Sequence, residues 1–272
     1  MFGKNGKSPA VSSLCPTSPS PPSHEYNKLV VFDKDGTLLA FDKPWLAWCS
    51  RLMTELGNAA ASNIKKDLGC VLGEMGVNLK QGKIELGAFA EACFADVLAD
   101  IKTTYTASLE KMMKDNVLFS ETIESCREEG DASKYPLTNI SKLFSQLREL
   151  GYAIAVATAD TADGIEKFFK NNQVEVDFVL CADTPDYPPK PSKISAEKLC
   201  SHFGVHPDDV VMVGDTPTDM RFGINGNFGL VVGVTTGIGE ETDLKQAGAH
   251  IVLDDLTDFV SILKRSHCSV SR

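Results

Sequence analysis

The chain has 272 residues, of which 43% are hydrophobic and 24% are charged, a composition typical of a globular protein with one large domain or a core with an inserted domain. Its formal net charge of −10 argues against nucleic acid or an anionic membrane surface as the main partner, because phosphate polymers require clustered Lys and Arg. No apolar run approaches the ~18 residues that a membrane-spanning helix needs, so neither nucleic acid nor a membrane is an expected partner.

The first 27 residues differ from the rest of the chain. Residues 1–27 are rich in Ser and Pro, which predicts a disordered tail. They contain no arginine and no amphipathic period, so a transit peptide is the weaker alternative, and they lack the apolar stretch of a secretory signal. Eight scattered cysteines without a CxxC pair indicate packing cysteines in a reducing compartment. We therefore expect a cytoplasmic protein.

The segment 29–38, with the sequence LVVFDKDGTL, is the most informative part of the chain. Its apolar beginning predicts a buried strand, which ends in two carboxylates two positions apart, Asp33 and Asp35. Residues i and i+2 of an extended chain face the same way, so both carboxylates should point into one space. That space lies at the carboxyl end of a strand, where open α/β sheets bind ligands. Two like charges this close need a shared proton or a cation, and Mg²⁺ prefers such oxygen ligands.

Residues 40–135 show almost wholly helical periodicity, with apolar residues recurring at intervals of three and four. We interpret this segment as an inserted helical cap, which leaves residues 28–39 and 136–267 as the core. Trp45 and Trp48 most simply form the hydrophobic core of the cap, with substrate contact as the alternative. We expect Lys80 and Lys83 to lie on a solvated face, and the alternative is that either binds a substrate carboxylate.

After Pro136, apolar strands alternate with helices. The sequence predicts helices at 143–150, 164–169, 196–203, near 219 and at 256–263, and strands at 153–157, 178–181, 210–213, 230–232 and 251–253. Such alternation predicts a parallel sheet covered on both faces. The expected fold is therefore α/β, with a Rossmann-like parallel sheet core and an inserted helical cap domain.

Polar residues follow three of these strands. Thr158 and Asp160 follow one strand, Lys190 lies in a Pro-rich loop after the next, and Asp215 and Asp219 follow a third. Because the carboxyl ends of parallel strands share one edge, these residues should converge with the first aspartate pair. The set suits phosphoryl transfer: carboxylates for Mg²⁺ and for proton transfer, and a hydroxyl, turn amides and a lysine for phosphate oxygens.

The motifs DKDGT, a strand ending in Thr158, Lys190 in a Pro-rich loop and GDTPTD, in this order, resemble the haloacid dehalogenase superfamily of phosphohydrolases. The resemblance covers about residues 28–263. The insertion after the first motif resembles the C1 cap subclass. The stretches GVNLKQGKIELGAFAEA and GVTTGIGEETDLKQAGAHIVLDDL are similar to phosphoglycolate phosphatase-like members.

The resemblance implies distinct roles for the acidic residues. Asp33 would attack phosphorus and become an aspartyl-phosphate. Asp35 would protonate the leaving alcohol and then deprotonate the hydrolytic water. Mg²⁺ would be bound by the Asp33 carboxylate, the Asp35 backbone carbonyl and Asp215. Asp219 would be a further metal ligand, directly or through water, or would orient Lys190.

The resemblance also implies the residues that hold the phosphate. Thr158, the following amide of Ala159 and Lys190 would bind phosphate oxygens, together with the turn amide at Gly36. Asp160 stands where small relatives often have Asn, so this loop departs from the common pattern. The presence of Asp35 disfavours the dehalogenases, which lack the second Asp.

Other interpretations of individual residues stay open. The first aspartate pair could be a turn, Asp219 could simply cap a helix, and Lys193 competes with Lys190 for the role of the site lysine. Lys34 after Asp33 also occurs in ion-pump ATPases, but those have Thr at the second acidic position. His202 and His206 are separated by four residues, but a turn interrupts the helical spacing, so a structural role is favoured over metal binding.

The resulting prediction is a Mg²⁺-dependent phosphatase that acts on a small phosphorylated metabolite, with phosphoglycolate as the first substrate to test. The alternatives are a phosphomutase of similar fold and a non-catalytic regulatory protein on the same fold. The expected assembly is a monomer or homodimer.

Overall fold

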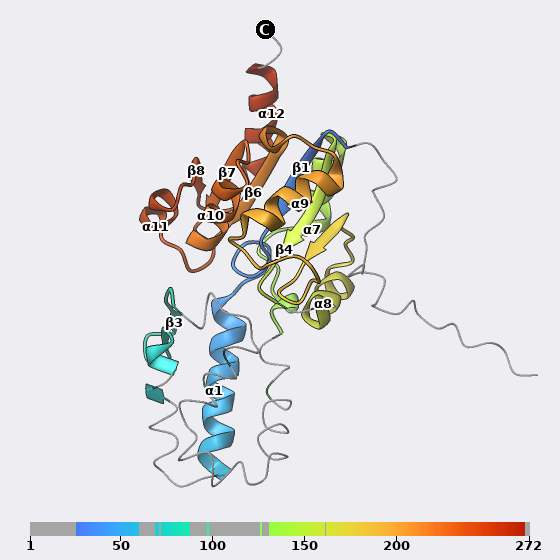
Figure 1. Ribbon diagram of the computed structural model, residues 1–272. Coiled ribbons are helices and arrows are strands. Elements are labelled where there is room, and N and C mark those ends of the chain that lie inside the picture. The colour runs from blue at the N-terminus through green and yellow to red at the C-terminus, as the bar shows by residue number, and fades with distance from the viewer. Residues whose placement is uncertain are drawn as a thin grey trace, which may run out of the picture.

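The computed structural model describes residues 26–59, 69–70, 72–87, 97, 126, 131–160 and 162–269. Its centre is a six-stranded sheet in which every paired strand is parallel, in the order β5-β4-β1-β6-β7-β8. The strands are β1 (Lys28–Phe32), β4 (Tyr152–Ala157), β5 (Phe178–Leu180), β6 (Val210–Gly214), β7 (Leu230–Val234) and β8 (Ile251–Leu253). Figure 1 shows β1 in the middle of the sheet. The predicted parallel α/β core is confirmed.

Helices connect these strands and cover the sheet. They are α7 (Ile140–Glu149), α8 (Ala162–Asn172), α9 (Lys193–Phe203), α10 (Pro217–Asn225), α11 (Glu241–Gln246) and α12 (Phe259–Ser269), with short 3₁₀ turns η2 (Ala132–Lys134) and η3 (Pro207–Asp209). The sequence pattern did not reveal α11, because this six-residue helix buries only Leu244. The helix predicted at 256–263 begins three residues later than expected.

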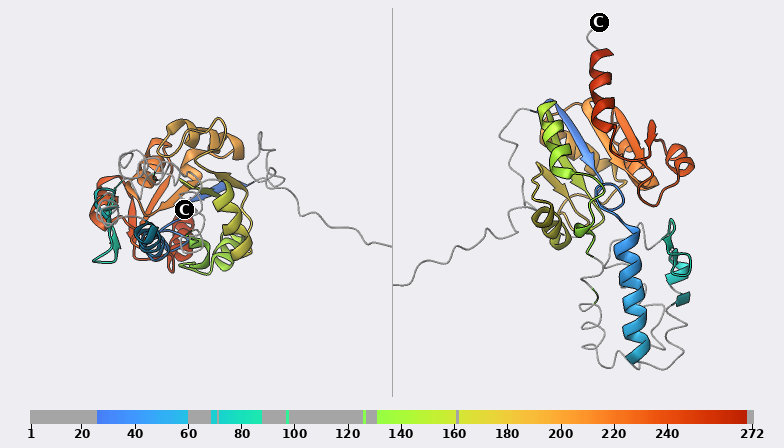
Figure 2. Two further views of the ribbon diagram at one scale, coloured as in Figure 1. Left: turned by 90° about the horizontal axis from the view of Figure 1, so that it is seen from below. Right: turned by 180° about the vertical axis from the view of Figure 1, so that it is seen from behind.

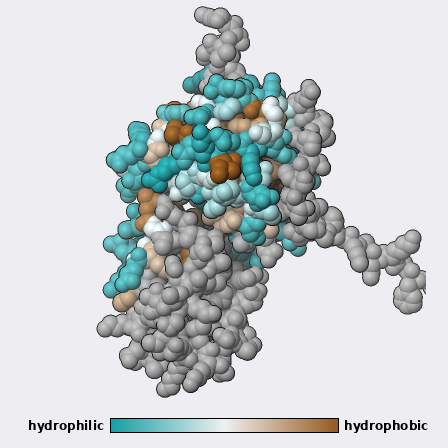
Figure 3. All heavy atoms as spheres, in the orientation of Figure 1, coloured by the Kyte–Doolittle hydropathy of each residue, from teal (hydrophilic) through white to brown (hydrophobic). Residues whose placement is uncertain are grey.

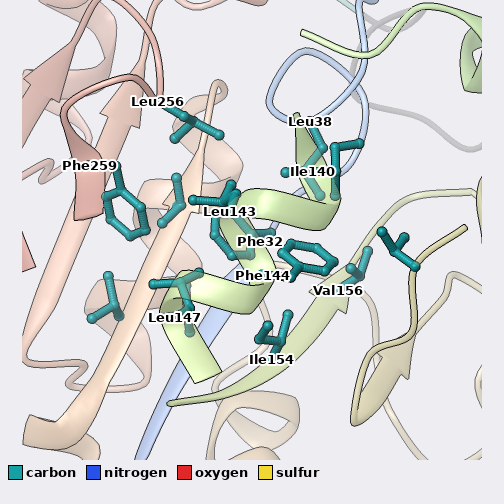
Figure 4. Close-up of a cluster of buried hydrophobic side chains, with 14 of the residues drawn as sticks. Phe32, Leu38, Ile140, Leu143, Phe144, Leu147, Ile154, Val156, Leu256 and Phe259 are labelled. Carbon is teal, nitrogen blue, oxygen red and sulfur yellow. The ribbon is translucent and has the colours of Figure 1, made fainter. Parts of the chain in front are cut away.

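Side chains alternate along each strand, and helices cover both faces of the sheet, so both faces are buried. Val30 and Phe32 of β1 pack in a cluster with residues of α7, α8 and α12 (Figure 4). Leu29 and Val31 belong to the opposite cluster, which includes residues of α9 and α10. A strand buried on both faces is a continuous apolar run, which explains the sequence of β1.

The inserted segment leaves the core after β1 and contains α1 (Asp42–Ala59), β2 (Val77–Asn78) and β3 (Lys83–Ile84). It projects from the sheet edge at which β1 ends (Figures 1 and 2). The antiparallel β2–β3 pair corrects the expectation of an almost wholly helical insertion. Gly76 and Gly82 have φ values of +97° and +64°, a conformation that ends helices and favours tight turns. Much of the remaining insertion lies outside the described residues, as do residues 1–25 of the predicted tail.

The surface seen in Figure 3 is mostly hydrophilic over the core, with scattered hydrophobic residues. Among the described helices, none has the length and apolar character required to cross a membrane.

Candidate active site

The turn after β1 brings the first two aspartates to the carboxyl edge of the sheet. The Asp33 amide continues the pairing with β6 by donating to the Val213 carbonyl at 2.8 Å, and its side chain is buried. Gly36 has a φ of +90°, and a Cβ atom there would lie 2.3 Å from Asp215 Oδ2. Only glycine therefore combines this backbone conformation with the close approach of the Asp215 carboxylate.

Three carboxylates form a buried cluster at this edge. One oxygen each from Asp33, Asp215 and Asp219 lies within 4.8 Å of the others. The Thr37 hydroxyl donates to Asp215 Oδ1 at 3.2 Å, and the Ile238 amide donates to Asp215 Oδ2 at 3.0 Å. Asp215 is thus fixed from the β1 turn and from the loop after β7. These carboxylates come together because β1 and β6 are neighbours in the sheet.

Lys190 lies between two of these carboxylates. Its Nζ atom is 2.6 Å from Asp33 Oδ1 and 2.6 Å from Asp219 Oδ1, and its side chain is only 8% exposed. The loop that carries Lys190 is tied to α10, because the Asn225 side-chain amide donates to the Pro191 carbonyl at 2.8 Å. Lys193, the competing lysine, is 59% exposed and pairs with Glu197.

Asp219 is held by the first turn of α10. Its Oδ2 atom accepts from the Thr216 amide at 3.0 Å and from the Thr216 hydroxyl at 2.7 Å. The Thr216 hydroxyl oxygen also accepts from the Asp219 amide, which completes a capping box. Asp219 is thus the N3 residue of the capping box whose cap is Thr216, and it is also a partner of Lys190, so its place at the helix start is compatible with a place in the site.

The loop after β4 lies next to the β1 turn, because β1 and β4 are also paired. Thr158 is buried, and its hydroxyl oxygen accepts from the Asp160 amide at 3.1 Å. Ala159 is partly exposed between them. Lys34, which the sequence did not single out for the site, reaches across to Asp160, with 2.7 Å between Nζ and Oδ2, and also pairs with Asp35.

Burial and neighbouring negative charges raise the pKa of two carboxyl groups in this cluster. Burial raises the pKa of Asp33 to about 7, although Lys190 opposes this rise. Burial also raises the pKa of Asp215 well above its ordinary value, and the carboxylates of Asp33 and Asp219 raise it further. Burial alone would lower the pKa of Lys190, but Asp219 and Asp33 raise it above its ordinary value. Lys190 therefore stays charged, but its single positive charge does not keep Asp33 and Asp215 at their ordinary pKa values.

The donor set fits a hard divalent cation. The cluster offers carboxylate oxygens, which Mg²⁺ prefers, and no sulfur or imidazole ligand is near it among the described residues. If Asp33, Asp35, Asp215 and Asp219 were all ionised, their negative charge would exceed the positive charge of Lys34 and Lys190. A cation bound among them would lower the pKa of Asp33 and of Asp215 and compensate the excess negative charge.

Several other predicted residues lie away from the cluster. His202 packs against Phe178 and Phe203, and His206 caps the η3 turn. Trp48 is buried in the hydrophobic cluster of the insertion, against which Trp45 packs.

The loop after β7 contacts the insertion. Lys83 lies 3.7 Å from Glu240 of this loop. Ile238 of the same loop packs into the hydrophobic cluster of the insertion, a link that sequence periodicity could not reveal.

Comparison with known protein families identifies the family to which this chain belongs. The model for haloacid dehalogenase-like hydrolases matches residues 27–227 of this chain. The match covers most of the chain, from the residue before β1 to just past α10, and it includes Asp33, Lys190 and Asp219. The protein belongs to the haloacid dehalogenase-like hydrolases.

Similar proteins agree with this assignment. The chain is 28% identical over 130 residues to a phosphoglycolate phosphatase of Haemophilus influenzae, a region that covers 47% of this chain and 57% of that protein. The chain thus matches little more than half the length of this relative. A predicted phosphoglycolate phosphatase structure from Haemophilus somnus covers 89% of this chain and 100% of its own, with 19% identity and a TM-score of 0.59.

Two further solved structures share the fold. A putative β-phosphoglucomutase from Thermotoga maritima is 16% identical, covers 88% of this chain and 99% of its own, and has a TM-score of 0.61. A hydrolase of this family from Deinococcus radiodurans, with bound phosphate and sodium, is 15% identical, covers 90% of this chain and 98% of its own, and has a TM-score of 0.60. At these identities, the similarity concerns the fold alone.

Proposed function

We propose that this protein is a Mg²⁺-dependent phosphatase that hydrolyses a small phosphorylated metabolite through an aspartyl-phosphate on Asp33. The observation that carries the proposal is the buried cluster of Asp33, Asp215 and Asp219 with Lys190 between two of its members. Such a cluster combines a nucleophile, metal-binding oxygens and a cation at one point of the sheet edge. The family membership and the phosphatase relative support the same reaction class.

In the first half-reaction, a carboxylate oxygen of Asp33 attacks phosphorus, and the bond from phosphorus to the leaving oxygen breaks. Asp35 donates a proton to that oxygen, so that a neutral alcohol departs and the phosphoryl group stays on Asp33. In the second half-reaction, Asp35 takes a proton from water, the water oxygen attacks phosphorus, and the bond from phosphorus to Asp33 breaks. The products are inorganic phosphate and the free enzyme.

The remaining residues hold the phosphate and the metal. Phosphate oxygens would be bound by Lys190, the Thr158 hydroxyl and the Ala159 amide as negative charge spreads over them. The Gly36 amide, the other donor expected from the sequence, donates to the Leu39 carbonyl at 2.7 Å in this structure. The metal site would use carboxylates of Asp33 and Asp215, the Asp35 carbonyl and Asp219, the last directly or through water. Bound Mg²⁺ would offset the repulsion between the anionic nucleophile and the phosphate.

The proposal also covers the domain arrangement, the substrate, the location and the assembly of the protein. Residues 40–135 would form a cap over the site, residues 28–39 and 136–267 the core, and residues 1–27 a tail. A small metabolite would enter between cap and core, and the name of the phosphoglycolate phosphatase relative makes phosphoglycolate the first compound to test. We place the enzyme in the cytoplasm as a monomer or homodimer.

The decisive experiment replaces the nucleophile while keeping its shape. With Mg²⁺, the wild-type protein should release phosphate from p-nitrophenyl phosphate and from one or more compounds in a panel of phosphorylated metabolites. Asp33→Asn should remove this activity, because an amide oxygen is too weak a nucleophile to form the phosphoenzyme. Undiminished turnover by folded Asp33→Asn protein contradicts the mechanism. Transfer of the phosphoryl group to a sugar phosphate faster than to water would favour a phosphomutase.

A further inference from the structure

Lys34 is a buried cation that the proposed reaction does not use. Its Nζ atom lies 2.9 Å from Asp35 Oδ2 and 2.7 Å from Asp160 Oδ2, and its side chain is only 6% exposed. Removing an ammonium group from water is costly unless nearby acids compensate for it. Two carboxylates do so here, and one of them is the proposed acid and base. Lys34 is therefore placed to affect the chemistry without contacting the phosphate.

The second partner of Lys34 is fixed independently of it. The Asp160 amide donates to the Thr158 hydroxyl oxygen, and the Asp160 carbonyl accepts from the Ala182 amide at 3.0 Å. A Cβ atom on Gly164 would lie 1.9 Å from Asp160 Oδ2. The absence of a side chain at this position in α8 thus leaves room for the Asp160 carboxylate. Lys34 connects the β1 turn to this anchored carboxylate on the β4 loop.

The two oxygens of the Asp35 carboxylate differ in their surroundings. Lys34 pairs with Oδ2, whereas Oδ1 is buried and has no hydrogen-bond partner among the described residues. A carboxylate with one oxygen held is restricted in rotation, and its second oxygen remains available to give or accept a proton. Proton transfer requires this kind of placement, because it depends on hydrogen-bond distance to the reacting oxygen.

We propose that Lys34, held by Asp160, is a positioning residue that fixes the Asp35 carboxylate for proton transfer. The inference rests on the proposed function, in which Asp35 protonates the leaving oxygen and later deprotonates water. A neutral side chain at position 34 would leave Asp35 and Asp160 facing each other without a cation between them. Asp35 Oδ2 would then lose the hydrogen bond from the Lys34 ammonium, and the Asp35 side chain could rotate out of position.

The test compares two leaving groups in Lys34→Met, which keeps side-chain length and removes the charge. An alkyl phosphate needs a proton on its leaving oxygen, whereas p-nitrophenolate departs without one. For phosphoglycolate, or the alkyl phosphate that the wild type hydrolyses fastest, we expect kcat/KM to fall by on the order of 10²-fold, within the usual range for acid catalysis. For p-nitrophenyl phosphate, the fall in kcat/KM should stay below about fivefold, because this step needs little acid catalysis.

A second readout concerns the hydrolysis of the phosphoenzyme. If Asp35 is misplaced, the variant should still form the aspartyl-phosphate from p-nitrophenyl phosphate, but water should attack it slowly. Rapid mixing should then show a burst of p-nitrophenolate of about one equivalent per enzyme, followed by slow turnover. A lysine that only stabilised the fold would change neither the leaving-group dependence nor the burst.

Three further variants separate positioning from stability. Asp160→Asn and Gly164→Ala should reproduce the selective loss on alkyl phosphates, the second by displacing the Asp160 carboxylate without removing a charge. Lys34→Arg should retain more alkyl phosphatase activity than Lys34→Met, because it restores the cation. Lys193→Met removes an exposed lysine and should leave kcat/KM for both substrates unchanged. Thermal unfolding by circular dichroism checks that each variant is folded.

Equal losses on both substrates, or no loss, from folded Lys34→Met protein would overturn the inference. If Lys34→Met does not fold, Asp160→Asn and Gly164→Ala decide by the same criterion. A wild-type protein without Mg²⁺-dependent phosphatase activity, or an active Asp33→Asn variant, contradicts the proposed function itself, and the role of Lys34 falls with it. The two failures are therefore distinguished by the wild type and Asp33→Asn alone.

Discussion

Lys190 illustrates how a single side chain would act in the proposed reaction. Its ammonium group lies 2.6 Å from carboxylate oxygens of both Asp33 and Asp219, so it neutralises part of the charge that an incoming phosphate would meet. As the phosphate binds, the same group can donate to a phosphate oxygen. Its two carboxylate partners keep the lysine charged and oriented before substrate arrives, which is the preorganisation that electrostatic catalysis requires.

We therefore expect Lys190→Met to lower kcat/KM for p-nitrophenyl phosphate by roughly 10²–10³-fold, the usual cost of losing a preorganised charge-stabilising donor. Steady-state kinetics with saturating Mg²⁺ measures this loss. Lys193→Met is the matched control, because Lys193 belongs to the same segment of chain but is exposed and pairs with Glu197. A comparable loss in both variants would show that Lys190 has no special role in the reaction.

At the scale of elements, the start of α10 contributes both stability and alignment. Thr216 caps the helix and binds Asp219 through its amide and its hydroxyl. Asp219 in turn holds Lys190. The cap therefore connects the conformation of one helix end to the position of the site lysine. A helix cap elsewhere in the core lacks this connection, which makes the two roles separable by experiment.

Thr216→Ala and Asn139→Ala form a matched pair for this purpose. Asn139 caps α7, where its side-chain oxygen accepts from the Lys142 amide at 3.0 Å. Each variant should lose about 1 kcal/mol of unfolding free energy in urea, the usual cost of losing a helix cap. Only Thr216→Ala should also lower kcat, by about tenfold, because Asp219 Oδ2 then loses the shorter of its two hydrogen bonds to residue 216 and keeps only the one from the backbone amide. Equal activities of the two variants would mean that the cap does not align the site.

At the scale of the whole molecule, the acidic cluster should connect stability to Mg²⁺ and pH. Burial raises the pKa of Asp33 to about 7 and that of Asp215 well above its usual range. The folded apoprotein therefore binds more protons than the unfolded chain, so these groups stabilise it at low pH. This stabilisation is lost as the pH rises through the folded pKa values. Mg²⁺ binding requires the deprotonated carboxylates and should offset the loss.

We expect the melting temperature of the EDTA-treated protein to fall between pH 5 and pH 8 through the contribution of these groups. Mg²⁺ should raise the melting temperature more at pH 8 than at pH 6. At a Mg²⁺ concentration of about 100 times Kd, the free energy of unfolding should increase by about 2.7 kcal/mol. Differential scanning fluorimetry measures both effects. Asp215→Asn is the control, since it should remove most of the response to Mg²⁺. A response that is independent of pH would contradict metal binding by this cluster.

The insertion shows the limit of reading periodicity. Its apolar spacing predicts helix, and α1 agrees, but a short antiparallel pair follows, β2 and β3. Two-residue strands are too short to produce a recognisable alternation, and their turn depends on the backbone conformation of Gly82 together with the contact from the Gln81 amide to the Asn78 side chain. In the core, by contrast, continuous apolar runs identified each strand of the sheet, including the three-residue strands β5 and β8.

The sequence by itself determined the class of the fold and predicted which residues form the site. A buried strand has to be a continuous apolar run, and polar residues placed directly after such runs can only lie at one edge of a parallel sheet. This argument leads to Asp33 and Asp215 without coordinates, and the short segments that follow the same strand ends add Lys190 and Asp219. The tertiary structure decided which of these residues touch one another. Strand order places β1 between β4 and β6, and contacts such as those of Lys34 with Asp160 and of Ile238 with Asp215 join residues that are distant in sequence and follow no local pattern.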